Sequence, residues 1–253
     1  MNKTFNKLSS LCSLISCGRA TLGFMLVGAF AIFGQGAHSA GLAENKVTAS
    51  VIDSKLVFDQ ALNDYFAGRY SDAQKGYNRL KDTDYHGVSA VPAAINAIAQ
   101  TQYSDAQKSF AEIKKGSSQR DKEYAQLWNL WLTAKQWKGS NEELNKELKR
   151  QVESQTWHLP FEKSIAGLYA GRETVESVFD AVSALTADAA LHQDALTEAT
   201  FFAGGYLQNV KHDNAAAKQL FNDNLNKLNS VSLERPLIDR ECAALNKLIH
   251  QSK

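Results

Sequence analysis

The sequence YSDAQKGY at residues 70–77 returns as YSDAQKSF at residues 103–110, so the two copies lie 33 residues apart. Self-similarity at a period of this length is typical of stacked helical repeats, in which each unit buries an apolar face against its neighbours. No segment shows the sustained alternation of apolar and polar residues that predicts a strand. We therefore predict an all-α fold, a repeat α-solenoid of about 10–11 helices. Such folds present extended binding surfaces.

Small and aromatic residues recur around both copies at fixed spacing. A third unit begins at Trp137, the Ala-Gly-Arg turn of residues 67–69 returns at residues 170–172, and residues 201–221 hold a further unit. The spacing resembles the tetratricopeptide (TPR) pattern, which is carried here by Gly68, Tyr70, Ala73, Tyr77, Tyr103, Ala106 and Phe110, with Thr101 in place of the second turn glycine. This resemblance implies pairs of helices whose aromatic residues pack between them.

The first 40 residues differ in character from the rest of the chain. Three basic residues and no acidic residue precede an uncharged apolar run at residues 20–33, and a stretch of small and polar residues follows as far as Ala40. This order predicts a secretory signal peptide over residues 1–40, cleaved so that the mature chain begins between Ala40 and Glu44. We therefore expect a periplasmic protein.

Two alternatives would keep the chain at a membrane. The apolar segment is retained as an anchor, although its 14 residues are fewer than the roughly 20 that a span needs. Alternatively, Cys17 in the loose lipobox at residues 14–17 is lipidated. In the mature chain Cys242 stands alone, so it is expected as a buried thiol or as a link between two chains.

Charge and local motifs argue against several classes of function. Removing residues 1–40 leaves 25 basic and 27 acidic side chains, a net charge of −2, which disfavours nucleic acid as a partner. The six histidines show no metal-ligand spacing, and the sequence contains neither a G-x-S-x-G elbow nor a phosphate-binding loop. We expect no cofactor and no enzymatic activity. An enzyme with an unrecognised acidic site is the minor alternative.

Periodicity and turn signals divide the mature chain into helices. The expected helices cover residues 50–67, 71–81, 89–100, 104–114, 120–137, 141–155, 160–170, 173–186, 191–209, 213–228 and 235–250, with Ser71 and Asp72 capping the second. A linker at residues 114–119 separates N-terminal repeats at 41–116 from more divergent repeats at 117–253. Trp128, Trp131 and Trp137 gather on one expected helix, either as core or as an interface.

The C-terminal half carries a second resemblance. Its landmarks are LWNLWLTA at residues 127–134, Trp157, the turn at 169–171, TEATFFAGGYL at 197–207 and Arg240. Their order resembles the NlpI family of enterobacterial TPR lipoproteins over roughly residues 120–250. The resemblance implies a periplasmic scaffold, often a homodimer, that holds envelope proteases or peptidoglycan hydrolases together.

We therefore expect a TPR scaffold or adaptor whose partner is a protein or peptide client, with no small-molecule cofactor. The client groove would lie along the first helices of successive repeats. Its predicted residues are Lys55, Phe58, Leu62, Tyr65, Val91, Ile95, Ile98, Asn129 and Leu132. Their apolar character predicts a hydrophobic client, or a groove filled by residues 41–50 or by a second protomer. The alternative function is an accessory factor for assembling a secretion system, a pilus or a surface adhesin.

Overall fold

The computed structural model describes residues 40–116, 118–185 and 188–251, and the side chains of residues 53–116, 118–185 and 188–247. The predicted signal peptide, Cys17 included, lies outside the described residues except for Ala40. Among the helices of the described residues, none combines the length and the apolar character needed to cross a membrane.

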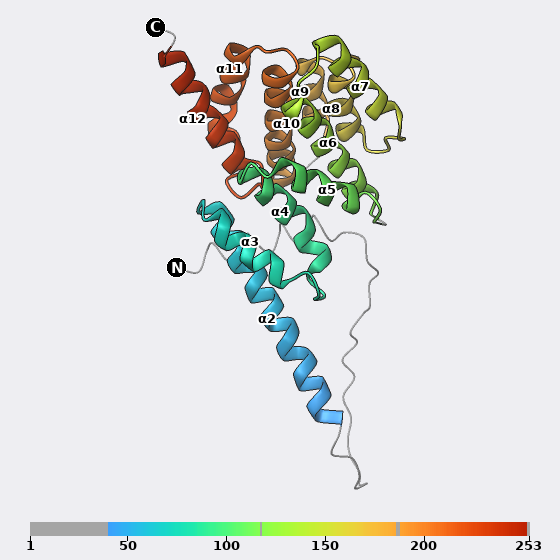
Figure 1. Cartoon of the computed structure of the whole chain (residues 1–253), viewed down its shortest axis with the longest axis vertical. Helices are drawn as coiled ribbons and strands as arrows, with labels where there is room; N and C mark the ends of the chain where they lie inside the picture. The colour runs from blue at the N-terminus through green and yellow to red at the C-terminus, as the bar shows by residue number, and fades with distance from the viewer. Residues whose placement is uncertain (1–39, 117, 186–187, 252–253) are drawn as a thin grey trace.

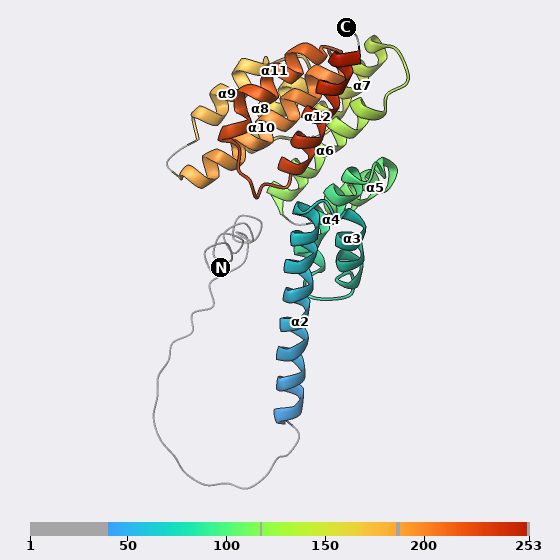
Figure 2. The same ribbon diagram turned by 90° about the vertical axis from the view of Figure 1, so that its left-hand side faces the viewer.

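The described part of the chain contains eleven α-helices and no strand, which confirms the all-α prediction. The elements are α2 (Ala40–Phe66), α3 (Tyr70–Arg79), α4 (His86–Ala99), α5 (Tyr103–Ile113), α6 (Gln119–Gln136), α7 (Asn141–Glu153), α8 (Pro160–Tyr169), α9 (Val175–Ser183), α10 (Ala189–Asn209), α11 (Asn214–Asn224), the short 3-10 helix η1 (Leu225–Lys227) and α12 (Arg235–Gln251). Consecutive helices pack against one another, and the first turns of α2 extend beyond their neighbours (Figures 1 and 2).

Three of the turns between paired helices share one backbone design. Gly68, Thr101 and Gly171 have φ angles of 75°, 61° and 69°, in the left-handed region that ends many helices. The residue after each donates its N–H to a carbonyl five residues back, at 2.8 Å, 2.9 Å and 2.9 Å respectively. Thr101 therefore occupies the turn position of Gly68 in conformation as well as in sequence.

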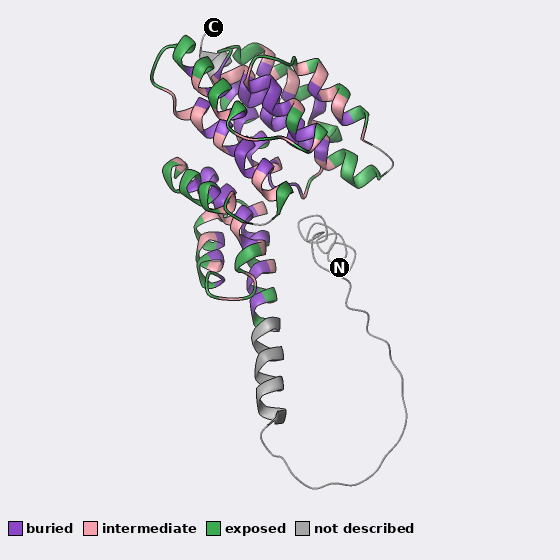
Figure 3. Ribbon diagram, turned by 90° about the vertical axis from the view of Figure 1, so that its right-hand side faces the viewer, coloured by how far each residue is buried: buried purple, intermediate pink, exposed green. Residues whose placement is uncertain are grey.

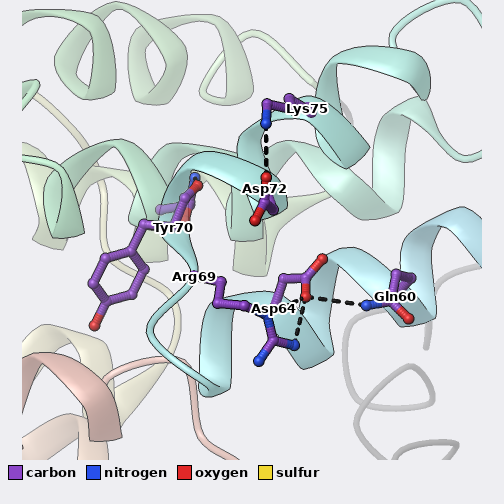
Figure 4. A network of polar contacts seen from close by, with 7 residues as sticks. Gln60, Asp64, Arg69, Tyr70, Asp72 and Lys75 are labelled. Carbon is purple, nitrogen blue, oxygen red and sulfur yellow. Dashed lines mark hydrogen bonds and ion pairs between the residues drawn. The ribbon is translucent and has the colours of Figure 1, made fainter.

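The turn between α2 and α3 is tied by side chains (Figure 4). The carboxylate of Asp64 accepts hydrogen bonds from Arg69 at 2.8 Å and 2.6 Å and from Gln60 at 3.0 Å. The prediction that Ser71 and Asp72 cap α3 is wrong, because α3 already begins at Tyr70 and its N-cap residue makes no side-chain cap. Asp72 lies in the first turn and pairs with Lys75 at 2.7 Å.

An aromatic cluster joins α5, α6 and α10 in the interior. The ring of Phe110 stacks on Trp128 with 5.6 Å between centroids, and Phe201 lies 4.8 Å from Trp128 and 5.4 Å from Trp131. A Cβ atom at Gly205 would lie 2.4 Å from the indole nitrogen of Trp131, so glycine lets α10 approach α6 closely. Buried residues concentrate on these central helices (Figure 3).

The core continues across the predicted boundary at residues 116 and 117. Buried residues on both sides of it belong to one connected apolar cluster. The hydroxyl of Tyr65 in α2 donates to the carbonyl of Leu233 at 2.5 Å, and Arg240 in α12 donates to the carbonyl of Ala99 at 2.8 Å. The buried Cys242, a free thiol, lies on the same α12. The two ends of the described chain therefore pack together.

Candidate functional site

Seven of the nine residues predicted to line a client groove are core residues. They are Phe58, Leu62, Tyr65, Val91, Ile95, Ile98 and Leu132, none more than 7% exposed. Neighbouring helices of the same chain cover these faces, and α12 with its preceding loop reaches Tyr65 and Ala99. The expectation of one open groove over all nine positions is therefore corrected. Lys55 is exposed and Asn129 is half-buried.

An open groove does exist where α6 forms the floor and α5 and α7 form the walls. It consists of two adjoining cavities of about 500 Å³ and 440 Å³ that share Gln107 and Gln151. We call it the α5–α7 groove. Its lining residues are Gln107, Ala111, Lys114, Lys115, Gln126, Asn129, Leu132, Thr133, Gln136, Trp137, Lys138, Gly139, Glu147, Arg150, Gln151 and Ser154. The predicted residues Asn129 and Leu132 thus lie in it.

Five carboxamide side chains line this groove. Gln151 donates to Thr133 at 3.0 Å and to Glu147 at 2.9 Å, and Gln136 donates to the Leu132 carbonyl at 3.3 Å. Within the described part of the chain, the amides of Gln107 and Asn129 make no hydrogen bond, so their donors and acceptors stay available. A carboxamide offers both a carbonyl acceptor and two N–H donors. The groove can therefore pair with a peptide backbone.

Charged residues of the groove differ in how they are partnered. Arg150 grips Glu147 through two hydrogen bonds of 2.7 Å and 2.6 Å, which lower the pKa of Glu147 to about 2. Lys115 pairs with Glu112 at 2.7 Å. Lys114 instead donates to the side-chain carbonyl of Gln126, and burial lowers its pKa. Lys114 is thus the cation of the groove whose partner is a neutral amide.

The indole of Trp137 is held in place at the far end of the groove. Its Nε1 donates to the carbonyl of Ser140 at 2.9 Å, and a Cβ atom at Gly139 would lie 2.9 Å from the same nitrogen. Ser140 and Glu143 form a capping box that starts α7 immediately afterwards. The four tryptophans therefore divide, because Trp128 and Trp131 are core while Trp137 and Trp157 stay half-buried.

A second polar cluster lies inside the molecule, away from the groove. Glu234 accepts hydrogen bonds from Ser232 at 2.5 Å and from the hydroxyl of Tyr124, and Glu198 lies 3.6 Å from Arg120. Burial raises the pKa of both carboxyl groups. Both side chains are under 10% exposed. This cluster can influence stability but offers a substrate no access.

A third cavity, of about 540 Å³, lies between α3, α4, α5 and the start of α6. The predicted groove residue Val91 forms part of its wall. Its rim carries two basic-type side chains, Lys81 and His86, and two acidic ones, Glu112 and Asp121. This mixture selects no class of ligand.

Neither the groove nor the inner cluster has the composition of a metal site. Among the described residues, no group of histidine, cysteine, aspartate or glutamate side chains could hold a metal ion. Lys114, Trp137, Gln107 and Gln151 were not predicted as groove residues, although the sequence had singled out Trp137 as core or interface. No family model matches the chain, and neither does any curated protein.

Proposed function

We propose that this chain is an exported, non-enzymatic helical-repeat scaffold, an adaptor that binds a protein or peptide client in the α5–α7 groove. The observation that carries the proposal is an open groove with unpaired carboxamides at Gln107 and Asn129. Extended peptides bind folded proteins largely through their main-chain hydrogen-bonding groups. Carboxamides on rigid helices can meet those groups at a small entropic cost.

The sequence supports the remaining parts of the proposal. The 33-residue repeat favours a solenoid of TPR type, and the character of residues 1–40 favours export to the periplasm. The resemblance of residues 120–250 to the NlpI family favours an envelope adaptor whose clients are proteases or peptidoglycan hydrolases. On this proposal the scaffold positions other proteins and needs no cofactor.

Site-specific photo-crosslinking in the full chain tests the groove. A photoreactive amino acid replaces Gln107 on α5, and in the control it replaces Gln219, an exposed glutamine on α11. After irradiation in cells that export the chain, we expect Gln107 to yield a defined crosslinked protein that Gln219 does not. Mass spectrometry identifies the product, and a protease or murein hydrolase would support the NlpI-like role. Equal labelling from both positions would overturn the groove assignment.

A further inference from the structure

The cavity of about 500 Å³ at the α5 end of the groove has an unbalanced charge. Its lining includes Lys114, Lys115 and Arg150 and no acidic residue. The mature chain as predicted carries a net charge of −2, so this concentration of cations is local and does not follow from a basic chain. An anionic group is the ligand that such a cavity favours.

The three cations are not equally available to a ligand. Lys115 and Arg150 are each paired with a carboxylate of their own helix, Glu112 and Glu147. Within the described residues, Lys114 has no carboxylate partner and contacts only the amide of Gln126, which is 3% exposed. A half-buried ammonium group loses part of its hydration, and a carboxylate would restore that loss through a charge-assisted hydrogen bond.

The adjoining cavity favours a different kind of side chain. Trp137 presents a half-buried indole that is held by Ser140 and packed against Gly139, and Leu132 and Thr133 line the same cavity. Its charged residues, Lys138 and Glu147, are of opposite sign. Rigid tryptophan rings are frequent anchors at interfaces. This cavity therefore suits an apolar or aromatic side chain.

We infer that the α5–α7 groove selects an extended acidic client segment, with a carboxylate side chain on Lys114 and an apolar side chain on Trp137. The inference rests on the proposed function. The two cavities share Gln107 and Gln151, so one segment can run through both. Along an extended chain, side chains two residues apart point the same way and lie about 7 Å apart. The preferred client thus carries an aspartate or glutamate close in sequence to an apolar residue.

A random peptide selection tests this specificity without knowledge of the client. The full chain is panned against displayed octapeptides in parallel with Lys114→Gln and with Lys108→Gln. Lys108 is a matched control, since it lies on the same helix outside the groove and pairs with Asp105 at 3.4 Å. We expect acidic residues beside apolar ones to be enriched by the wild type and by Lys108→Gln. The Lys114→Gln variant should lose the acidic enrichment.

Peptides recovered from the selection are then synthesised with a fluorophore, and their affinity is measured by anisotropy. Loss of a charge-assisted hydrogen bond predicts an affinity at least about tenfold weaker for Lys114→Gln. Trp137→Ala tests the second anchor, and circular dichroism checks that each variant is folded. Enrichment without acidic residues, or affinity unchanged by Lys114→Gln, would overturn the inference. If such peptides still crosslink at Gln107, the proposed function stands, and if none crosslinks there, both fail.

Discussion

At the scale of single residues, Glu198 and Glu234 couple the stability of the fold to pH. Glu234 accepts from Tyr124 and Ser232, while Glu198 has Arg120 at 3.6 Å as its closest cation. Burial disfavours the charged form and raises the pKa of both groups above the unfolded value. The folded chain therefore binds more protons than the unfolded chain between these pKa values, and its stability must fall as pH rises through that window.

We predict that the free energy of unfolding is greatest in mildly acidic solution and declines from about pH 4.5 upward. Glu198→Gln should reduce the slope by up to about 1.4 kcal/mol per pH unit and stabilise the chain at neutral pH. Urea unfolding at pH 5, 6, 7 and 8 measures both effects. Glu142→Gln, at an exposed position on α7, is the control and should follow the wild type. Parallel curves for wild type and Glu198→Gln would contradict the prediction.

Other charged groups face the same pair or act in another pH range. Asp194 on α10 and Glu162 on α8 raise the pKa of Glu198, whereas Arg120 on α6 lowers it. Glu147, with its pKa lowered to about 2 by Arg150, contributes stability that is lost only as pH falls toward that value. The decline above pH 4.5 is therefore separable from acid unfolding.

At the scale of helices, the approach of α10 to α6 depends on a glycine. A Cβ atom at Gly205 would lie 2.4 Å from the indole nitrogen of Trp131, which is 2% exposed and cannot move into solvent. We predict that Gly205→Ala lowers the free energy of unfolding by about 1–3 kcal/mol, the usual cost of overpacking a core. Urea unfolding monitored by tryptophan fluorescence measures it.

Gly87→Ala is the matched control for this prediction. Gly87 lies in the first turn of α4, and a Cβ atom there meets nothing within 4 Å. Alanine is the better helix former by about 0.5–1 kcal/mol, so this variant should be slightly more stable than the wild type. If Gly205→Ala behaved like Gly87→Ala, α10 and α6 would not be in the close contact described.

Most helix boundaries were predictable from local signals. Pro160 begins α8, as its tolerance at the first helical position predicts, and the repeat at residues 70–77 and 103–110 placed α3 and α5 within one residue of their starts. The cap of α3 was mispredicted because a left-handed turn at Gly68 leads directly into the helix and needs no side-chain cap. The start of α2 at Ala40 was missed because residues 40–49 lack a clear apolar face.

At the scale of the whole molecule, periodicity showed which faces are apolar but not what covers them. Phe58 and Ile95 were assigned to a client groove, yet the chain buries both. Burial there depends on contacts between residues far apart in sequence, such as Tyr65 with Leu233, that one sequence does not reveal. Lys114 was missed for a similar reason, since it was placed in a linker and its role depends on Gln126 across a helix boundary.

The same long-range contacts predict that the chain unfolds as one cooperative unit. In α12 Leu237 and Ile238 are at most 1% exposed, Arg240 donates to the Ala99 carbonyl, and Glu241 lies 3.6 Å from Lys135. Ile238→Ala should lower the free energy of unfolding by about 2–5 kcal/mol. Because α12 packs on the end of α4, amide protection in α2 and α4 should fall by a similar amount.

Native-state hydrogen exchange of the full chain measures this coupling, with Ala244→Ser at an exposed position of α12 as the control. A parallel loss of protection in α4 and α10 would join the segments 41–116 and 117–253 into a single folding unit, held by packing such as that of Phe110 on Trp128. Loss confined to α10, α11 and α12 would instead show that the two predicted segments are independent modules. In that case the α5–α7 groove, which takes residues from both, would lie at a mobile junction and could not preorganise its carboxamides for a client.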